Sequence, residues 1–417
     1  MYQVESARIL FARGARVSVR PFAVSRTVLL LGFTSLLTDV SAEMVNTVLP
    51  LYVFFAFGGA PLIVSLIDGL YQGATALLGI AGGLVADRSK RHKEVAAVGY
   101  GISAVCKLGL VLIGSVFSAL AALVVIDRAG KGVRTGPRDA MISMSSAPER
   151  LGMAFGVHRA LDTAGAMLGP LIAFGILLAE PGRYRSAFMV SFFFALLGLA
   201  VLVFLVEPAR RERVRKAEPI SIREAARALA APRFRRVTIA GTLLSFATIS
   251  DALFYLGLQR RLDLDVSSFP LLFVGTSLVY MLLAVPAGRL ADRLGRGRVL
   301  VAAYLLLPPV YAALLVTSLP VVGLIACLVA LGTWYAATDG VLAAFASSTL
   351  AEETRATGLS VVGGATGLAR LASSLLFGVL WTLAGITVAA LSFCGMLLAA
   401  TVAAALLLRQ PARVDAG

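Results

Sequence analysis

The sequence predicts an all-α integral membrane protein with twelve transmembrane helices in two pseudo-symmetric halves of six. Hydrophobic residues make up 59% of the 417 residues and charged residues only 15%, whereas about a quarter of a soluble domain is charged. The apolar residues lie in runs that can each cross a bilayer, which takes about 20 helical residues. A sequence pattern also recurs at about half the chain length, which indicates an internal duplication.

The apolar runs separate into two sets of six on either side of a basic stretch. The first set lies at 27–56, 61–86, 95–115, 117–141, 152–180 and 185–206, and the second at 237–258, 268–291, 298–317, 320–346, 356–382 and 385–408. This division predicts five parts: a tail at 1–26, a first half at 27–206, a linker at 207–236, a second half at 237–408 and a tail at 409–417.

Basic residues are distributed unevenly between the two sets of connecting loops. Lys and Arg are absent from the turns at 57–60, 114–119 and 318–319 but are frequent in 87–93, 207–236, 292–298 and both tails. Because basic loops stay in the cytoplasm, we expect a multi-pass protein of the inner (plasma) membrane with both termini cytoplasmic. This orientation explains the net charge of +15, so no nucleic-acid partner is expected.

Two of the basic loops share one sequence pattern. GGLVADRSKR ends the second span and AGRLADRLGR ends the eighth, and their aspartates, Asp87 and Asp292, are 292 − 87 = 205 residues apart. Duplication of a six-helix unit is typical of transporters, in which the substrate site lies near the midplane where the halves meet.

Through this pattern the chain resembles the major facilitator superfamily over nearly its whole length. The family's loop between helices 2 and 3 reads G-x-x-x-D-R-x-G-R. The matching residues are Gly83, Asp87, Arg88 and Arg91 in the first half, where Lys90 replaces the second Gly, and Gly288, Asp292, Arg293, Gly295 and Arg296 in the second. The resemblance implies that these loops are cytoplasmic gates, whose Asp bonds to a neighbouring helix when the transporter faces outward. A generic topogenic loop is the alternative.

The fifth span resembles the helix 5 motif of the drug:proton antiporter branch of this family. Gly156, Gly165, Gly169 and Pro170 match the start of that motif, whereas Ala173 and Phe174 replace its last two glycines. The resemblance implies an exporter. The alternative is that Gly165 and Gly169 form a small-xxx-small packing seam.

Acidic residues in the first and fifth spans are candidates for proton coupling. Asp39 and Glu43 lie one turn apart, and one shared proton would relieve their mutual repulsion. On the fifth span His158 and Asp162 also lie one turn apart, and Arg159 can neutralise Asp162.

Other polar residues in the spans have several possible roles. Arg128 matches the family's helix 4 motif, which implies that it assists proton transfer, but it could equally be a structural partner of Asp127. Residues that could line a central cavity are Asn46, Tyr71, Gln72, Arg159, Asp251, Tyr255 and Arg370.

These observations together predict a proton-coupled exporter, that is, an antiporter, of a small organic compound that works by alternating access. The alternatives are a proton- or cation-coupled symporter that imports a small organic anion, and a non-transporting membrane sensor. No nucleophile–base spacing, metal-ligand cluster or phosphate loop stands out, so we expect neither an enzyme nor a metal or cofactor site. The expected partners are a small-molecule substrate, protons and the lipid bilayer, and the expected state is a monomer.

The predicted topology can be tested by cysteine labelling from each side of the membrane. A cysteine at Ala217, in the basic linker, should react only from the cytoplasmic side, whereas one at Gly59 should react only from the opposite side. Labelling of both positions from the same side would contradict the assignment of the basic loops to the cytoplasm.

Overall fold

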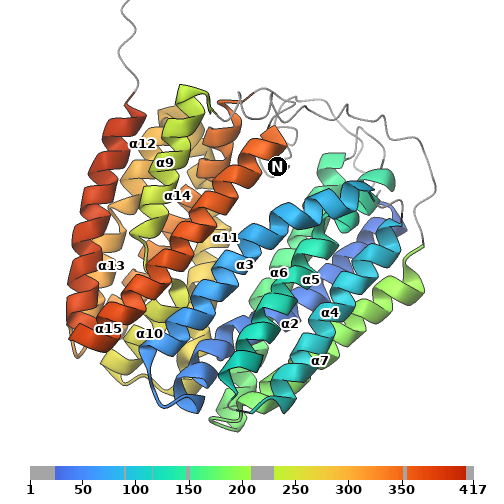
Figure 1. Cartoon of the computed structure of the whole chain (residues 1–417), viewed down its shortest axis with the longest axis horizontal. Helices are drawn as coiled ribbons and strands as arrows, with labels where there is room; N and C mark the ends of the chain where they lie inside the picture. Colours follow the sequence, from blue (N-terminus) through green and yellow to red (C-terminus); the bar gives the residue numbers. More distant parts are fainter. Residues whose placement is uncertain are drawn as a thin grey trace, which may run out of the picture.

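The computed structural model describes residues 24–88, 91–114, 116–146, 151–207, 230–350 and 355–409. Every regular element within these residues is a helix, which confirms the predicted all-α class. Figure 1 shows the helices in two groups, α2 to α7 on one side and α9 to α15 on the other.

The first group follows the predicted apolar runs closely. Its helices are α2 (Arg26–Ala56), α3 (Pro61–Arg88), α4 (His92–Leu112), α5 (Phe117–Met144), α6 (Leu151–Ala179) and α7 (Tyr184–Ala200), and α7 continues as the π-helical turn η2 (Val201–Leu205). Ser25 caps the start of α2 by accepting a hydrogen bond from the backbone N–H of Val28, as Ser commonly does at this position.

The second group contains more interruptions than its hydropathy suggests. Its elements are α9 (Pro232–Phe246), α10 (Asp251–Leu262), η3 (Val266–Ser268), α11 (Phe269–Leu294), α12 (Arg296–Tyr304), α13 (Leu307–Ala312), η4 (Ala313–Leu315), α14 (Val321–Ser347) and α15 (Arg355–Leu408). The last of these is two helical parts joined at Gly385, whose φ of 86° is not helical.

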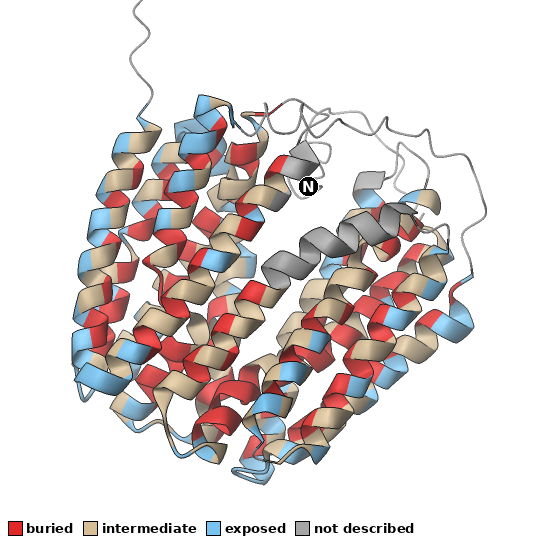
Figure 2. Ribbon diagram, viewed as in Figure 1, coloured by how far each residue is buried: buried red, intermediate tan, exposed pale blue. Residues whose placement is uncertain are grey.

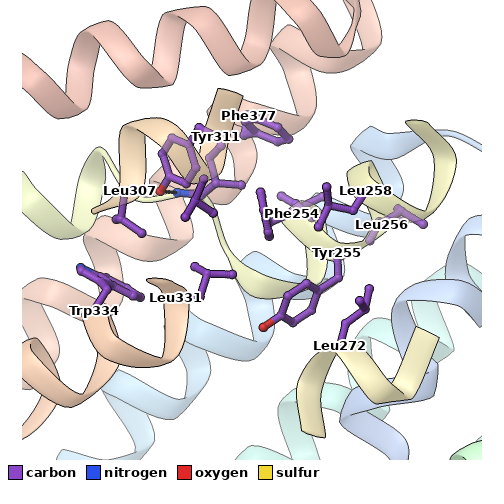
Figure 3. Close-up of a cluster of buried hydrophobic side chains, with 14 of the residues drawn as sticks. Phe254, Tyr255, Leu256, Leu258, Leu272, Leu307, Tyr311, Leu331, Trp334 and Phe377 are labelled. Carbon is purple, nitrogen blue, oxygen red and sulfur yellow. Dashed lines mark hydrogen bonds between the residues drawn. The ribbon is translucent and has the colours of Figure 1, made fainter. Parts of the chain in front are cut away.

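The interruption between α9 and α10 is stabilised by side chains from neighbouring helices. The Tyr311 hydroxyl accepts a hydrogen bond from the backbone N–H of Ile249 at 2.9 Å, and the Ser373 hydroxyl donates to the Thr248 carbonyl. Figure 3 shows Tyr311 in this position, beside the buried Phe254. Backbone N–H and C=O groups that have no helical partner inside a membrane need other hydrogen-bond partners. The interruption between α9 and α10 is therefore a stable part of the fold.

The outer surface of the helices is apolar, as contact with lipid requires. Phe204, Val322 and Leu383 are 81%, 77% and 82% exposed, and Figure 2 shows exposed residues along the outward faces of the helices. An apolar surface of this extent would be unfavourable in water. Nine helical segments in the described part are long and apolar enough to span a membrane, while α5 is interrupted by charges; the number twelve stays a prediction.

Within the first half, glycines allow α2 and α6 to pack closely. A Cβ atom at Gly169 would lie 2.7 Å from the Val40 carbonyl oxygen, and one at Gly165 would lie 2.9 Å from the Leu36 Cα. Only glycine fits so near another backbone, as at small-xxx-small contacts in membranes. A Cβ at Gly156 would meet nothing within 4 Å, so this glycine does not take part in the seam.

The two halves meet mainly along two pairs of helices. α3 packs against α15, and α6 packs against α11. A Cβ at Gly69 would lie 3.4 Å from the Leu371 carbonyl oxygen, and the Leu62 N–H donates to the Thr382 hydroxyl at 3.2 Å. These contacts lie on the part of α3 nearest its start, at the end of the molecule away from the start of α2 (Figure 1). They close that end of the interface between the halves.

Candidate functional site

The charges of α5 form a buried ion-pair cluster in the first half. Asp127 accepts hydrogen bonds from Lys107 of α4, at 2.5 Å, and from its neighbour Arg128. The side chains of Lys107 and Arg128 are each 4% exposed and that of Asp127 is 10% exposed. Buried charges require such pairing. Arg128 is therefore a partner of Asp127, as one of the two sequence interpretations predicts, and its role in proton transfer stays a prediction.

Arg128 also faces the central part of the first half. Its guanidinium carbon lies 4.1 Å from the centroid of the Tyr71 ring, a cation–π contact. Its Nε is buried and has no hydrogen-bond partner among the described residues. Next to Tyr71, a cavity of about 20 Å³ is also lined by Asn46, Asp68 and Ala252. A space of this size is large enough for one water molecule, and Asn46, Asp68 and Tyr71 are the polar residues of an otherwise apolar lining.

A second polar cluster joins α2, α5 and α6. Arg138 of α5 contacts Asp162 of α6 at 4.0 Å and Ser35 of α2 at 3.2 Å, and it also pairs with Asp139. The Ser35 hydroxyl lies 2.9 Å from Nε2 of the buried His158. Ser35 and Arg138 thus link the predicted candidates His158 and Asp162 to two further helices.

Asp39 and Asp162 approach each other at the centre of this cluster. The carboxyl groups of Asp39, on α2, and Asp162, on α6, are close enough to interact with each other. Two neighbouring carboxylates repel each other, and a single proton shared between them would relieve that repulsion. Arg159 pairs with Asp162 at 2.9 Å, and Lys131 and Arg134 interact electrostatically with Asp39. These cations favour negative charge on the pair.

Glu43, the other predicted member of the proton-sensitive pair, has different neighbours. Its Oε2 accepts a hydrogen bond from the Asn46 amide at 3.1 Å, on the same helix. Arg128 and Lys131 of α5 interact with it electrostatically. Asp39 and Glu43 therefore differ in their carboxyl partners, although both lie near α5 and α6.

The second half contributes a separate set of acidic and phenolic groups. Asp251 accepts a hydrogen bond from Tyr335 at 2.6 Å, and Asp339 accepts one from Tyr280 at 3.4 Å. Arg370 interacts electrostatically with both of these carboxylates. The predicted candidates Asp251 and Arg370 thus belong to one network. Tyr255, in contrast, is 1% exposed and donates to Thr276 at 2.6 Å, so it is part of the core (Figure 3).

Asp68 of α3 connects the two halves and was not among the predicted residues. It accepts a hydrogen bond from Ser374 of α15, and Ser250 and the predicted candidate Gln72 lie close enough to interact with it. Lys107 was missed in the same way. Both are single charged residues in otherwise apolar runs, SLIDGL and VCKLGL. Such residues are rare at membrane depth and have a specific partner or function, and this signal could have identified them.

The predicted gate loops are only partly described. Gly83, Asp87 and Arg88 fall in the last part of α3, where the side chains of residues 75–90 lie outside the described part, and Arg91 is exposed before α4. In the second loop, Arg296 donates to Asp292 at 2.8 Å and to the Ala344 carbonyl of α14 at 2.8 Å. A Cβ at Gly288 would meet nothing within 4 Å, and Arg293, like Arg296, lies at this helix junction.

The duplicated helical fold and its buried polar clusters define the class as a multi-pass membrane transporter. The family model of the Major Facilitator Superfamily matches residues 31–270 and 238–417. An uncharacterized MFS-type transporter of Methanocaldococcus jannaschii is 30% identical over 367 residues, which cover 86% of this chain and 89% of the relative. This chain therefore belongs to the major facilitator superfamily and is a secondary transporter.

Solved structures support the same fold at low sequence identity. The nucleoside transporter NupG is 14% identical with a TM-score of 0.77, and the match covers 93% of this chain and 100% of that one. A POT family transporter in complex with a thioalcohol conjugated peptide is 15% identical with a TM-score of 0.72, over 92% of this chain and 95% of that one. At these identities the comparison concerns the fold alone.

The buried ion pairs allow a stability prediction. Asp127→Asn should lower the free energy of unfolding by ~3–5 kcal/mol, because Lys107 and Arg128 would remain buried without their counterion. Asp139→Asn, on the same helix, is the matched control. Its side chain is 42% exposed, so the loss should be at most about 1 kcal/mol. Unfolding in detergent measures both variants, and equal losses would contradict the structural role of Asp127.

Proposed function

We propose that this transporter is a proton-coupled antiporter that exports a small organic compound by alternating access. The observation that carries the proposal is the carboxyl pair of Asp39 and Asp162 between α2 and α6. A proton held at such a pair is released when the surroundings change, and this linkage is what exchange of a proton for a substrate requires.

Loss of the proton would change the forces between the two helices. With both carboxyl groups ionised, two negative charges would lie side by side in a poorly solvated site and repel each other. Arg138 lies 4.0 Å from Asp162 and 3.0 Å from Asp139, so it can move toward the new charge on Asp162. α6 also packs against α11 of the other half. A shift of α6 would therefore change the contact between the two halves, which move relative to each other during alternating access.

The direction of transport is inferred from the helix 5 motif. Gly156, Gly165, Gly169 and Pro170 match the start of a motif that marks exporters in this superfamily. Gly165 and Gly169 pack against α2 just beside the carboxyl pair, which is where a seam tight against proton leakage is needed. The motif and the pair together favour antiport.

A second candidate is a proton-coupled symporter that imports a small organic anion. Lys131 favours it, since this cation lies inside the first half and has no carboxylate within 4.0 Å among the described residues. The unpartnered Nε of Arg128 is a second donor for an anionic group. The solved structures of similar fold include a nucleoside transporter and peptide transporters, so nucleosides and short peptides are test compounds alongside organic cations.

The proton site can be tested in liposomes with a pH-sensitive dye inside. Ethidium, uridine and dialanine are each added in turn, and the dye reports which of them changes the internal pH. That compound is then tested for accumulation against its own concentration gradient, driven by a pH gradient. Asp39→Asn and Asp162→Asn should each strongly reduce uphill movement but retain exchange down a substrate gradient. The expected drop is roughly 5- to 150-fold, the range of ordinary coupling free energies.

Glu43→Gln is the matched control, because Glu43 lies one turn from Asp39 but bonds to Asn46. It should keep its proton coupling. If Glu43→Gln stops uphill movement and Asp162→Asn does not, the shared proton belongs to Asp39 and Glu43 instead. Protons moving into the liposome with the compound, rather than against it, would favour the symporter.

A further inference from the structure

The end of the molecule where the halves are in contact contains a pocket of about 500 Å³. The first half contributes Phe54 and Pro61, from the end of α2 and the start of α3. The second half contributes Arg260 and Arg261 of α10 and Trp381 and Thr382 of α15. This volume is within the range of small-molecule sites, which is roughly 300–1,000 Å³. The pocket is therefore large enough for a ligand that contacts both halves.

The two arginines of this pocket have different surroundings. Arg261 donates to the carbonyl oxygens of Leu314, at 3.1 Å, and Leu315, at 3.5 Å, and to the Thr387 hydroxyl at 2.9 Å. Its guanidinium is thus fixed by neighbouring backbone. Arg260 is exposed, and its guanidinium carbon lies 5.0 Å from the centroid of the Phe54 ring in the other half.

The arginines of this pair form no direct ion pair in the described part of the chain, although Asp263 and Asp265 lie in the adjoining loop. Among the described residues, neither Arg260 nor Arg261 has a carboxylate within 4.0 Å. The backbone carbonyl groups at the C-terminus of α10 offset part of their positive charge, since both arginines lie in the last turn of this helix. The hydrogen-bond donors of Arg260 nevertheless remain available, because no protein acceptor binds them in the described part.

The location of the pair also differs from that of most basic residues in this chain. Basic loops orient membrane proteins by staying in the cytoplasm. Arg260 and Arg261 precede the loop at residues 263–265, at the same end as the uncharged turn 57–60, so they lie on the predicted outer side. Orientation does not account for two adjacent arginines there.

We propose that this pocket binds an amphipathic anion, with a phosphate or carboxylate group on Arg260 and an apolar portion against Phe54 and Trp381. A guanidinium donates two parallel hydrogen bonds to such a group, and the aromatic rings provide the apolar wall. This site is separate from the buried clusters of the proposed transport mechanism. A ligand held by both halves adds to the Leu62–Thr382 hydrogen bond beside it and stabilises the closed arrangement of this end.

The anion can come from the outer leaflet as a lipid headgroup or from solution. Leu383, two residues after Trp381, is 82% exposed, so an apolar surface suited to contact with lipid adjoins the pocket. The required chemistry is the same for both sources: anionic oxygens attached to a small organic group.

The test measures the unfolding temperature of the full chain, purified in neutral detergent and stripped of lipid. Phosphatidylglycerol is the lipid probe, glycerol 1-phosphate is the soluble probe, and phosphatidylcholine is the lipid without net charge. The variant is Arg260→Gln. Arg185→Gln is the matched control, because Arg185 is an exposed arginine that follows the turn 180–183 at the predicted outer end.

We expect phosphatidylglycerol to raise the unfolding temperature of the wild type and of Arg185→Gln. In Arg260→Gln its apparent affinity should fall by roughly tenfold or more, as loss of a hydrogen bond between charged groups predicts. Arg260→Lys, which keeps the charge but not the two parallel donors, should be intermediate. Stabilisation by glycerol 1-phosphate with the same dependence on Arg260 would support the site and assign its ligand to solution.

Two results would overturn the proposal. Equal stabilisation of the wild type by phosphatidylcholine and phosphatidylglycerol, with no effect of glycerol 1-phosphate, would show that no anion is recognised. An equal loss of affinity in Arg260→Gln and Arg185→Gln would show a general effect of surface charge rather than a pocket.

Discussion

The close packing of α2 on α6 is the constraint on which the candidate site depends. Gly165 and Gly169 let the two backbones approach to distances that no side chain would allow. At that separation Asp39 and Asp162 reach each other. A larger residue at either glycine would separate the helices, and the carboxyl groups would then need other partners. Helix packing and the chemistry of the pair are thus two consequences of one contact.

The low polarity of the surroundings explains why charges in this chain occur in groups. An isolated charge inside a membrane protein is costly, so Asp127 is bound by Lys107 and Arg128. The same reasoning applies to Asp68, which accepts from Ser374 across the interface between the halves. That bond must break if α3 and α15 separate. Polar contacts of this kind hold the halves together less permanently than apolar packing, which suits a protein that alternates between two states.

The sequence was sufficient to predict the all-α membrane class and many of the buried polar residues, although not Asp68 or Lys107. Hydropathy and length locate apolar helices without knowledge of their neighbours. The interruption at Thr248 and Ile249 was not predicted, because its stability comes from Tyr311 and Ser373, far away in the sequence. The Gly385 bend, in contrast, coincides with the predicted boundary between the last two spans.

The partners of the polar residues were harder to predict than the residues themselves. Spacing along α2 showed that Asp39 and Glu43 share a helix face. It could not show that Asp162 of α6 lies beside Asp39, whereas Glu43 bonds to Asn46 on its own helix. The choice between the two interpretations of Arg128 depended on the same information, since its contact with Tyr71 comes from another helix. Spacing describes one helix, whereas a site is built from several.

Infrared spectroscopy of the purified protein tests the central claim most directly. A protonated carboxyl group has a carbonyl stretch that is distinct from that of a carboxylate. The account predicts that this band is present near neutral pH and is lost or shifted in Asp39→Asn and in Asp162→Asn, but is retained in Glu43→Gln. A band that is unchanged in both aspartate variants would contradict a proton shared between Asp39 and Asp162.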